Sequence, residues 1–427
     1  MKKLYFLTLS LLTTMVTVNA QTPCDGGRYA TDLFTVTVTS DINYGQNDDF
    51  TGSNTMLDMD IYEPTGDTET ARPLIIWAHG GSFIGGTKTE ADVVELSNRF
   101  AQKGFVCASI DYRTGMWPID SVNAIKALLR AVQDMKASTR FFYQDAVGAN
   151  TYKIDTTRIY IGGSSAGALT ALHYAYLDKE CEIEEFMSLS DLNALGGLEG
   201  ASGNPGYSTE VAGVINLCGA LARYGWIENG DVPFVSLHGD EDGTVPYSRG
   251  EASVSGFPIM YLDGSRMLDE HAGTIGVQSN FYTHYGGGHV VYLGDADYMD
   301  TTVNFVRDFL IDQMACTDAP LQAANAPSGA ANLYDLYYCG LGIAEESNMM
   351  IKEIYPNPSS EQVTVVFGDG VVLSEIVLLD ISGRIINSYS VNSSSLIIRK
   401  NSLKAGVYIL KSTNENGVVS TNKIVFK

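Results

Sequence analysis

The sequence predicts a mainly parallel, eight-stranded α/β sheet flanked by helices, followed by a small all-β sandwich. Two runs alternate apolar and polar residues as half-exposed strands do. Six later runs are short, apolar and end at glycine or polar residues, which is typical of buried parallel strands. The alternating runs are 34–40 and 56–62, and the apolar runs are 73–81, 105–113, 158–164, 213–220, 233–240 and 280–288.

Helical segments are expected between several of these strands, which gives the alternation of an α/β domain. One helix is opened by Asp120 or Ser121, both residue types that cap helix N-termini. Each of two helices carries one apolar face with a period near 3.6 residues. These faces are formed by Val122, Ile125, Leu129 and Val132, and by Val303, Val306, Leu310 and Met314.

Composition divides the chain into four parts. Residues 1–20 have a positive start, an apolar middle and small residues at the end, so they are predicted to be a signal peptide. Residues 21–316 form the α/β domain. Residues 317–349 are rich in Ala, Asn, Pro and Gly and are predicted to be a linker. Residues 350–427 contain short strands at regular spacing, which predicts a β-sandwich.

The charge distribution argues against two classes of partner. The chain has a formal net charge of −23 from 27 basic and 50 acidic residues. Residues 21–349 carry 17 basic and 44 acidic residues, a net charge of −27. An acidic body of this kind excludes nucleic acid and anionic lipid as expected partners. No segment after the signal peptide is apolar and long enough to span a membrane.

Six cysteines are present and none has CxxC or CxxH spacing, so no metal site is expected. Cys107 and Cys218 lie in apolar strand runs and are predicted to be buried thiols. The other four lie in loops or at element ends, where an oxidising compartment permits disulfides. A bond between Cys316 and Cys339 is the first expectation because the loop between them is short.

The segment 163–167, GSSAG, lies where a buried strand runs directly into a helix. A serine at such a turn is raised above the sheet edge, and the turn requires small residues two positions before and after it. Placing Ser165 at the apex puts glycine on both sides. The competing frame places Ser164 between Gly162 and Ala166 and is the poorer fit.

A serine nucleophile needs a base and a carboxylate that orients the base. His289 follows the last predicted strand on a loop free to bend over the sheet, whereas His173 lies inside the helix after the turn and is expected to be a packed or surface residue of that helix. Candidate carboxylates follow the strand that ends at His238. They are Asp240, Glu241 and Asp242.

The glycine-rich segment 77–86, WAHGGSFIGG, follows the third predicted strand. Consecutive glycines allow backbone N–H groups to converge on one oxygen. The N–H groups of Gly81, Ser82 and Ala166 are therefore predicted to form an oxyanion hole. The alternative is a glycine-rich turn without a ligand, and the segment lacks the lysine of a phosphate-binding loop.

Together these motifs resemble the α/β-hydrolase superfamily, and within it the carboxylesterases and lipases with an HGGxF motif. The motifs are HGGSF at 79–83, GSSAG at 163–167, HGDEDGTVP at 238–246 and GGGH at 286–289. The family spacing HGxxDxxVP indicates Asp242 as the carboxylate that orients the histidine, and Asp240 is the alternative. The resemblance implies a catalytic triad of Ser165, Asp242 and His289. No cofactor is implied.

Two departures from the family pattern bear on the substrate. Ser82 replaces the third glycine of HGGG, and no room is left between residues 220 and 233 for a large cap domain, although loop 182–212 is long enough to cover part of the site. Phe83, Trp117 and Trp226 each follow a strand end on the side of the site and are candidates for substrate binding.

The predicted function is secreted ester hydrolysis through an acyl-enzyme. The substrate stays open between small esters and polymers such as a polyester or an acetylated or feruloylated polysaccharide. Two other hypotheses are a serine peptidase and a non-catalytic binding module. The peptidase is less favoured because no selecting domain fits, and the binding module because all three triad positions are filled.

The tail is similar to the C-terminal sorting domain of type IX secretion in Bacteroidetes. The resemblance rests on IYPNPSSEQVTV, LLDISGRII and LKAGVYILK, and on the ending KIVFK. It implies the type IX machinery as a partner and export to the cell surface or the medium of a Gram-negative bacterium. A carbohydrate-binding sandwich is the alternative, less favoured because the tail has no Trp.

Overall fold

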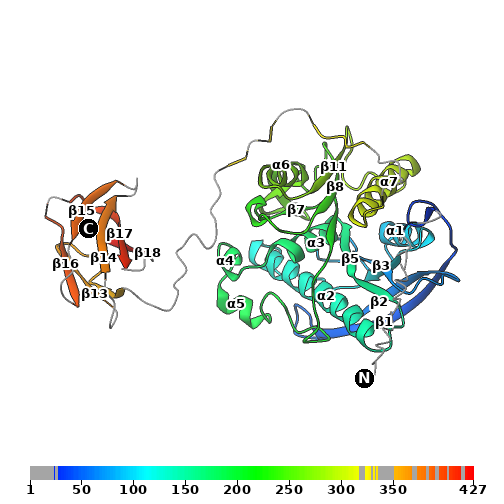
Figure 1. The fold of residues 1–427 in the computed structure, drawn as a ribbon, viewed down its shortest axis with the longest axis horizontal. Coiled ribbons are helices and arrows are strands. Elements are labelled where there is room, and N and C mark those ends of the chain that lie inside the picture. The colour runs from blue at the N-terminus through cyan, green and yellow to red at the C-terminus, as the bar shows by residue number, and fades with distance from the viewer. Residues whose placement is uncertain are drawn as a thin grey trace, which may run out of the picture. The chain divides into compact units, whose positions relative to one another are not determined.

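The computed structural model of the protein contains two compact units, Met1–Tyr337 and Tyr338–Lys427 (Figure 1). The residues that the structure describes are 24, 27–316, 323–327, 330–331, 333–334, 351–367, 373–380, 384–389, 394–401, 403–414 and 419–427. The predicted signal peptide lies outside them. No helix in this described part is both long and apolar enough to cross a membrane.

The larger unit is built on an eight-stranded sheet with the order β1-β2-β4-β3-β5-β6-β8-β11. β1, β2 and β4 pair antiparallel, and every other neighbouring pair is parallel. The predicted sheet is confirmed. Its strands are β1 Val36–Asp48, β2 Asn54–Pro64, β3 Arg72–Ala78, β4 Val106–Ile110, β5 Ile154–Ser164, β6 Gly213–Leu217, β8 Phe234–Gly239 and β11 Ser279–His284.

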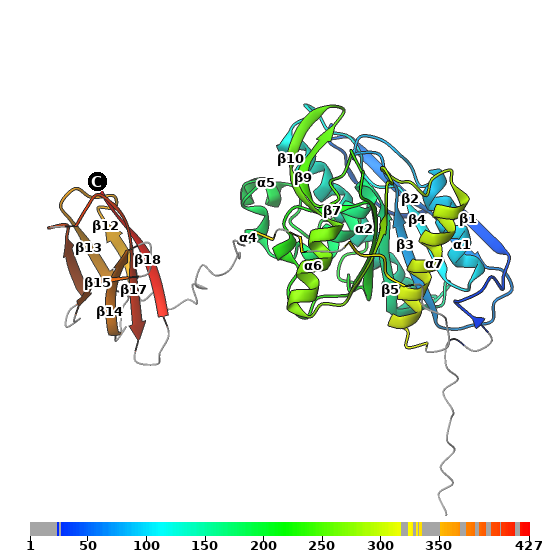
Figure 2. The same ribbon diagram turned by 90° about the horizontal axis from the view of Figure 1, so that it is seen from above.

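Helices cover both faces of this sheet (Figure 2). One face packs against α1 Ala91–Gln102 and α7 Ala296–Gln313, and the other against α2 Ser121–Val147, α3 Ala166–Tyr176 and α6 Ser265–Ile275. Asp120 caps α2 by accepting a hydrogen bond from the Asn123 N–H at 2.8 Å. The apolar side chains of the parallel strands therefore fill two cores, one on each face.

A second small sheet with the order β7-β10-β9 lies outside the main one. It contains β7 Ala220–Leu221, β9 Arg249–Val254 and β10 Phe257–Gly264. Ser255 and Gly256 join β9 to β10, and their φ angles of 50° and 81° are both positive, as in a type I′ hairpin turn. This hairpin is not among the strands predicted above, although a Ser-Gly pair between two strand-like runs is a turn signal.

Short helices occupy the long connection between α3 and β6. They are α4 Glu180–Ile183 and α5 Leu189–Ala194. A separate 3-10 turn, Tyr224–Trp226, follows β7. Arg113, Asp134 and Ser202 form a buried network that ties this connection to α2. Asp134 Oδ1 lies 2.8 Å from Arg113 Nη2 and accepts a hydrogen bond from the Ser202 hydroxyl at 2.6 Å.

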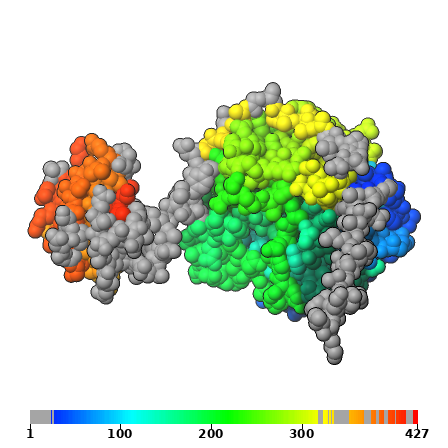
Figure 3. Space-filling model, viewed as in Figure 1, coloured from blue at the N-terminus to red at the C-terminus, as the bar shows by residue number. Residues whose placement is uncertain are grey.

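Part of the expected linker is held against the larger unit. Asn325 pairs with Thr283 through two hydrogen bonds of 2.9 Å, and the Tyr334 hydroxyl donates to Asp263 at 2.5 Å. Figure 3 shows yellow surface, the colour of the end of α7 and of the described residues after it, along the upper edge of the larger unit. The described residues of this segment thus pack against the larger unit beyond Cys316.

The smaller unit contains two antiparallel sheets around one apolar core. One sheet has β12 Ile351–Tyr355, β13 Gln362–Phe367 and β16 Ser395–Arg399. The other has β14 Leu373–Asp380, β15 Ile385–Tyr389, β17 Gly406–Asn414 and β18 Val419–Phe426. Alternate residues of β13, such as Val363 and Val365, are buried between the sheets. This arrangement is the predicted all-β unit.

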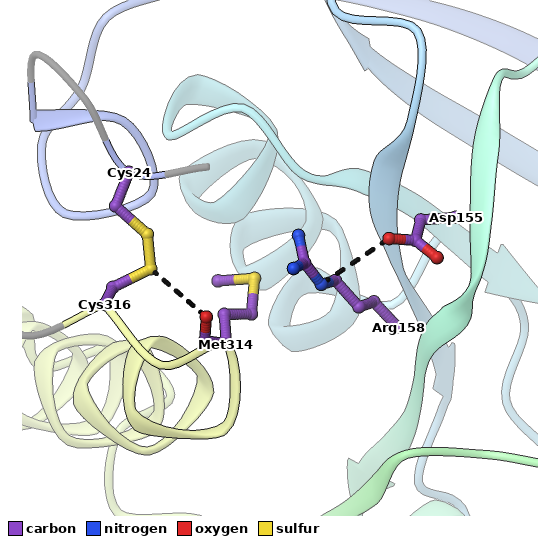
Figure 4. Close-up of a disulfide and its surroundings, with 5 residues drawn as sticks. All are labelled: Cys24, Asp155, Arg158, Met314 and Cys316. Carbon is purple, nitrogen blue, oxygen red and sulfur yellow. Dashed lines mark hydrogen bonds and ion pairs between the residues drawn. A yellow bond between two sulfur atoms is a disulfide. The ribbon is translucent and has the colours of Figure 1, made fainter. Parts of the chain in front are cut away.

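The disulfide expected between Cys316 and Cys339 is wrong. Cys316 is bonded to Cys24, with a Cα–Cα distance of 5.8 Å, because the start of the described chain lies beside the end of α7 (Figure 4). Loop length along the sequence cannot reveal this proximity, since 292 positions separate the two residues. Cys181 is also disulfide-bonded, and Cys107 and Cys218 are buried free thiols as predicted.

Replacing Cys24 and Cys316 together by serine is expected to lower the free energy of unfolding by about 2–4 kcal/mol, because the bond restricts a very long loop of the unfolded chain. Urea unfolding of the full chain measures this change. Each single substitution serves as a control and should cause a similar loss. Unchanged stability in all three variants would contradict a structural role for the bond.

Candidate active site

The site is built around a sharp turn between β5 and α3. Ser165 lies at this turn with φ 55° and ψ −119°, outside the regions that non-glycine residues usually adopt. Glycines flank it because the backbone of β3 passes very close. A Cβ atom added to Gly163 or Gly167 would lie 2.4 Å or 2.0 Å from the carbonyl oxygen of Ala78.

The two neighbouring serines have different surroundings. Ser165 Oγ lies 2.8 Å from His289 Nε2, and the residue is 7% exposed. Ser164 is 1% exposed, and its Oγ accepts a hydrogen bond of 2.6 Å from the Tyr292 hydroxyl. The geometry therefore brings Ser165, and not Ser164, to the histidine. No sequence signal pointed to Tyr292.

The other nitrogen of the His289 ring faces a carboxylate. Nδ1 lies 2.6 Å from Asp242 Oδ2, and the second oxygen of Asp242 accepts hydrogen bonds from the N–H groups of Thr244 and Val245 at 2.8 and 3.0 Å. Asp240 does not reach the histidine. Its Oδ1 accepts a 2.6 Å hydrogen bond from the Gly286 N–H and fastens the loop that carries His289.

A second histidine, His238, contacts the same carboxylate. His238 is fully buried, and its Nε2 lies 3.2 Å from Asp242 Oδ2 while its Nδ1 lies 2.8 Å from the Ser265 hydroxyl. Burial alone would raise the pKa of Asp242. Hydrogen bonds from His238 and His289, together with charge attraction, outweigh burial and hold the pKa of Asp242 well below its usual range. Asp242 is therefore a carboxylate at neutral pH.

The glycine-rich loop lies directly against Ser165. A Cβ atom added to Gly80 would lie 3.4 Å from Ser165 Cβ. Three successive residues, Gly81, Ser82 and Phe83, have positive φ angles of 118°, 55° and 62°. Within the described residues, the N–H groups of Gly81, Ser82 and Ala166 have no protein acceptor. These free donors near Ser165 Oγ are available to an oxygen of a ligand.

His79 fixes the shape of this loop. Its Nδ1–H donates a 2.6 Å hydrogen bond to the Gly80 carbonyl, and its ring stacks on Tyr112 with a centroid distance of 4.2 Å. The Tyr112 hydroxyl in turn donates to the His79 carbonyl at 2.8 Å. The loop is thus held by buried contacts rather than by a ligand.

An open cleft of about 600 Å³ contains the serine and the histidine. The glycine-rich loop forms one of its walls, and two carboxylates that the sequence analysis did not select, Glu90 and Asp92, also line it. Phe83 and Trp226 line a separate apolar cavity. Trp117 lies in neither space and is 76% exposed.

Three possible metal ligands lie close together at this site. In the part of the chain that the structure describes, they are Cys218, Asp242 and His289, with ligand atoms within 4.8 Å of one another. Burial, followed by the charge of Asp242, raises the pKa of the Cys218 thiol to about 12. The free thiol is therefore protonated at neutral pH, while Asp242 and His289 contact each other directly.

Comparison with known proteins agrees with this fold. Residues 59–195 match the family described as BD-FAE, and residues 353–427 match the secretion system C-terminal sorting domain. The larger unit has the α/β-hydrolase fold, and part of it is similar to an esterase family of that fold. The sorting domain indicates export through type IX secretion to the cell surface or the medium, so both predicted resemblances are confirmed.

Individual relatives are distant. Carboxylesterase 1D of Mus musculus is 32% identical over 93 residues, which are 22% of this chain and 15% of that protein. Esterase 2 of Thermogutta terrifontis, phosphorylated by paraoxon, is 20% identical with a TM-score of 0.49, covering 69% of this chain and 99% of the other. A truncated carbohydrate esterase from gut microbiota is 18% identical with a TM-score of 0.49, covering 67% and 99%.

His173, on α3, is a buried structural histidine, as its place inside the helix predicted. It is 1% exposed, its Nδ1–H donates to the Leu169 carbonyl at 2.7 Å, and its Nε2 accepts a 3.2 Å hydrogen bond from the Ala222 N–H. Burial, partly offset by the bond to Leu169, lowers the pKa of His173 to about 4. The folded protein therefore keeps this ring neutral.

Acidification is expected to destabilise the fold through His173. The unfolded chain protonates this residue near pH 6.5, about 2.5 units above the folded pKa, so stability is lost as the pH falls between these values. From pH 7 to pH 5, wild type should lose roughly 2 kcal/mol more than His173→Gln. Urea unfolding at both pH values measures this difference. Equal losses would exclude His173 as a source of acid sensitivity.

Proposed function

We propose that the protein is a secreted serine hydrolase that cleaves carboxylic esters through an acyl-enzyme. The observation that carries the proposal is a hydrogen-bonded relay, Asp242–His289–Ser165, that ends beside three free N–H groups. A serine hydroxyl becomes an effective nucleophile when a base takes its proton. Free donors beside it stabilise the oxyanion that forms on the attacked carbonyl.

In the first half-reaction, Ser165 Oγ attacks the ester carbonyl and its proton passes to His289 Nε2. Asp242 holds the His289 ring with Nδ1 protonated and Nε2 free, and it stabilises the imidazolium that forms. The N–H groups of Gly81, Ser82 and Ala166 bind the carbonyl oxygen as it gains negative charge. The tetrahedral intermediate collapses when His289 protonates the departing alcohol.

In the second half-reaction, water attacks the acyl-serine and gives a proton to His289. The same three N–H groups stabilise the second tetrahedral intermediate, and the proton returns to Ser165 Oγ as the carboxylic acid leaves. Removing one oxyanion donor typically costs on the order of 100-fold to 1000-fold in rate. All steps use side chains and backbone groups of this chain.

His238 acts through Asp242. Its Nε2 contacts Oδ2, the same oxygen that faces His289, and the N–H groups of Thr244 and Val245 donate to the other oxygen. These bonds favour the ionised carboxylate and fix its orientation toward His289. The open cleft leaves the alcohol side accessible, which suits both small and polymeric esters.

Ser165→Ala is expected to lower turnover of p-nitrophenyl acetate by at least about 1000-fold, because the nucleophile is removed. The matched control is the neighbouring Ser164→Ala, which should keep most of the activity. That variant should lose about 1–3 kcal/mol of stability, because the buried Tyr292 hydroxyl loses its partner. Steady-state kinetics and urea unfolding measure both effects.

Labelling by a fluorophosphonate separates the two serines directly. The wild type and Ser164→Ala should be labelled, and Ser165→Ala should not. If Ser164→Ala lost activity and Ser165→Ala kept it, the assignment of Ser165 as the nucleophile would be contradicted. An unlabelled and inactive wild-type protein would favour a non-catalytic binding module.

A further inference from the structure

The open cleft that contains Ser165 has an unbalanced charge. Among the described residues that line it, the acidic side chains are Glu90 and Asp92, and neither Lys nor Arg is present. Both carboxylates lie at the start of α1, where Glu90 is the N-cap residue and Asp92 belongs to the first turn. The cleft therefore presents negative charge to a ligand that reaches the serine.

Asp92 differs from the other buried acidic residues in the described ranges. It is 6% exposed, and no ion pair to Lys or Arg joins it. The hydrogen bond made by its side chain comes from the N–H of the next residue, Val93, at 2.9 Å. Each of the other buried acidic residues contacts a Lys or Arg side chain. They are Asp60, Asp134, Glu182, Asp263 and Asp308.

A buried carboxylate without a counter-ion is costly. The positive end of the α1 dipole offsets part of this cost at Asp92. The charge of Asp92 still acts on its surroundings, because burial, followed by this charge, raises the pKa of Tyr112 well above its usual range. A positive group on a ligand in the cleft would supply the counter-ion that the protein lacks.

Glu90 is free to follow such a group. Its side chain is exposed, and it makes no capping hydrogen bond to α1. The cleft has a volume of about 600 Å³. A compact space of this volume is only about 10 Å across, close to the Debye length at physiological salt, so charges inside it are incompletely screened from one another.

We propose that Glu90 and Asp92 form a cation-selecting subsite, and that the preferred substrates are esters with a positively charged group beside the scissile bond, such as esters of an amino alcohol. The inference rests on the proposed esterase function, because the subsite shares its cleft with Ser165 and His289. Esters with a carboxylate at the same place are repelled by the two acidic side chains.

Acetylcholine and 3,3-dimethylbutyl acetate provide the first test, because they have nearly the same shape and differ in one positive charge. The ratio of their kcat/KM values is divided by the ratio of their rates with hydroxide, since the ammonium group also makes choline a better leaving group. Wild type should favour acetylcholine by at least about tenfold on this scale. About 1 M NaCl should reduce the preference, because salt screens charges.

Three variants of the full chain assign the preference to the cleft. Asp92→Asn and Glu90→Gln should each lower the corrected ratio by about threefold or more, and the double variant should lower it further. The matched control is Glu210→Gln, which also removes one acidic charge. Glu210 is exposed and precedes β6, so it lies at the opposite end of the parallel strands from Ser165. Its substitution should leave the ratio unchanged.

A second pair of esters places the charge on the acyl side. It consists of p-nitrophenyl 5-(trimethylammonio)pentanoate and its neutral analogue p-nitrophenyl 6,6-dimethylheptanoate. The pair that shows the preference identifies the part of the ester that faces the two carboxylates.

No corrected preference in either pair would overturn the proposal. A preference that persists unchanged in the folded double variant, or that falls equally in Glu210→Gln, would also overturn it. Because Glu90 is exposed, Glu90→Gln keeps the test decisive if Asp92→Asn fails to fold. Failure of the esterase proposal itself is distinguishable, because wild type would then hydrolyse none of the four esters.

Discussion

The close approach of β3 to the strand-to-helix turn constrains the rest of the site. The Ala78 carbonyl leaves no space for a side chain at residue 163 or 167, so only glycine at these positions permits β3 to approach the turn between β5 and α3 so closely. This contact places the end of β3, and therefore the glycine-rich loop that follows, directly beside Ser165. The N–H donors and the nucleophile are consequently positioned by one backbone contact rather than by separate features.

The carboxylate and the histidine depend on a different pair of neighbours. β8 and β11 are parallel and adjacent at the sheet edge, so the loops that follow them emerge together. Asp240 and Gly286 join these loops, and Asp242 and His289 face each other as a result. His238 lies near the end of β8 and contacts the same oxygen of Asp242 as His289. The relay thus follows from strand order, which brings distant segments of the chain to one edge.

Residues close together in the sequence were the most predictable. The eight strands and the turn at Ser165 follow local patterns of apolar residues and glycine, and the structure agrees with them. Contacts between distant segments were not predictable, because local patterns contain no information about them. The bond between Cys24 and Cys316, the contact between Tyr292 and Ser164, and the support of Asp242 by His238 belong to this class. The β9–β10 hairpin, by contrast, has a local signal in its sequence, the Ser255-Gly256 pair at its turn.

The bond between Cys24 and Cys316 joins the two ends of the hydrolase core into a covalent ring. A protease that cuts an exposed loop between these residues would leave the two pieces linked, so the cut chain remains one molecule. Such cuts are an ordinary hazard outside the cell. The sorting domain lies beyond Cys316 and outside the ring, so its removal leaves the ring closed. The sorting domain therefore serves export, whereas the disulfide bond protects the larger unit, and the two features lie in separate parts of the chain.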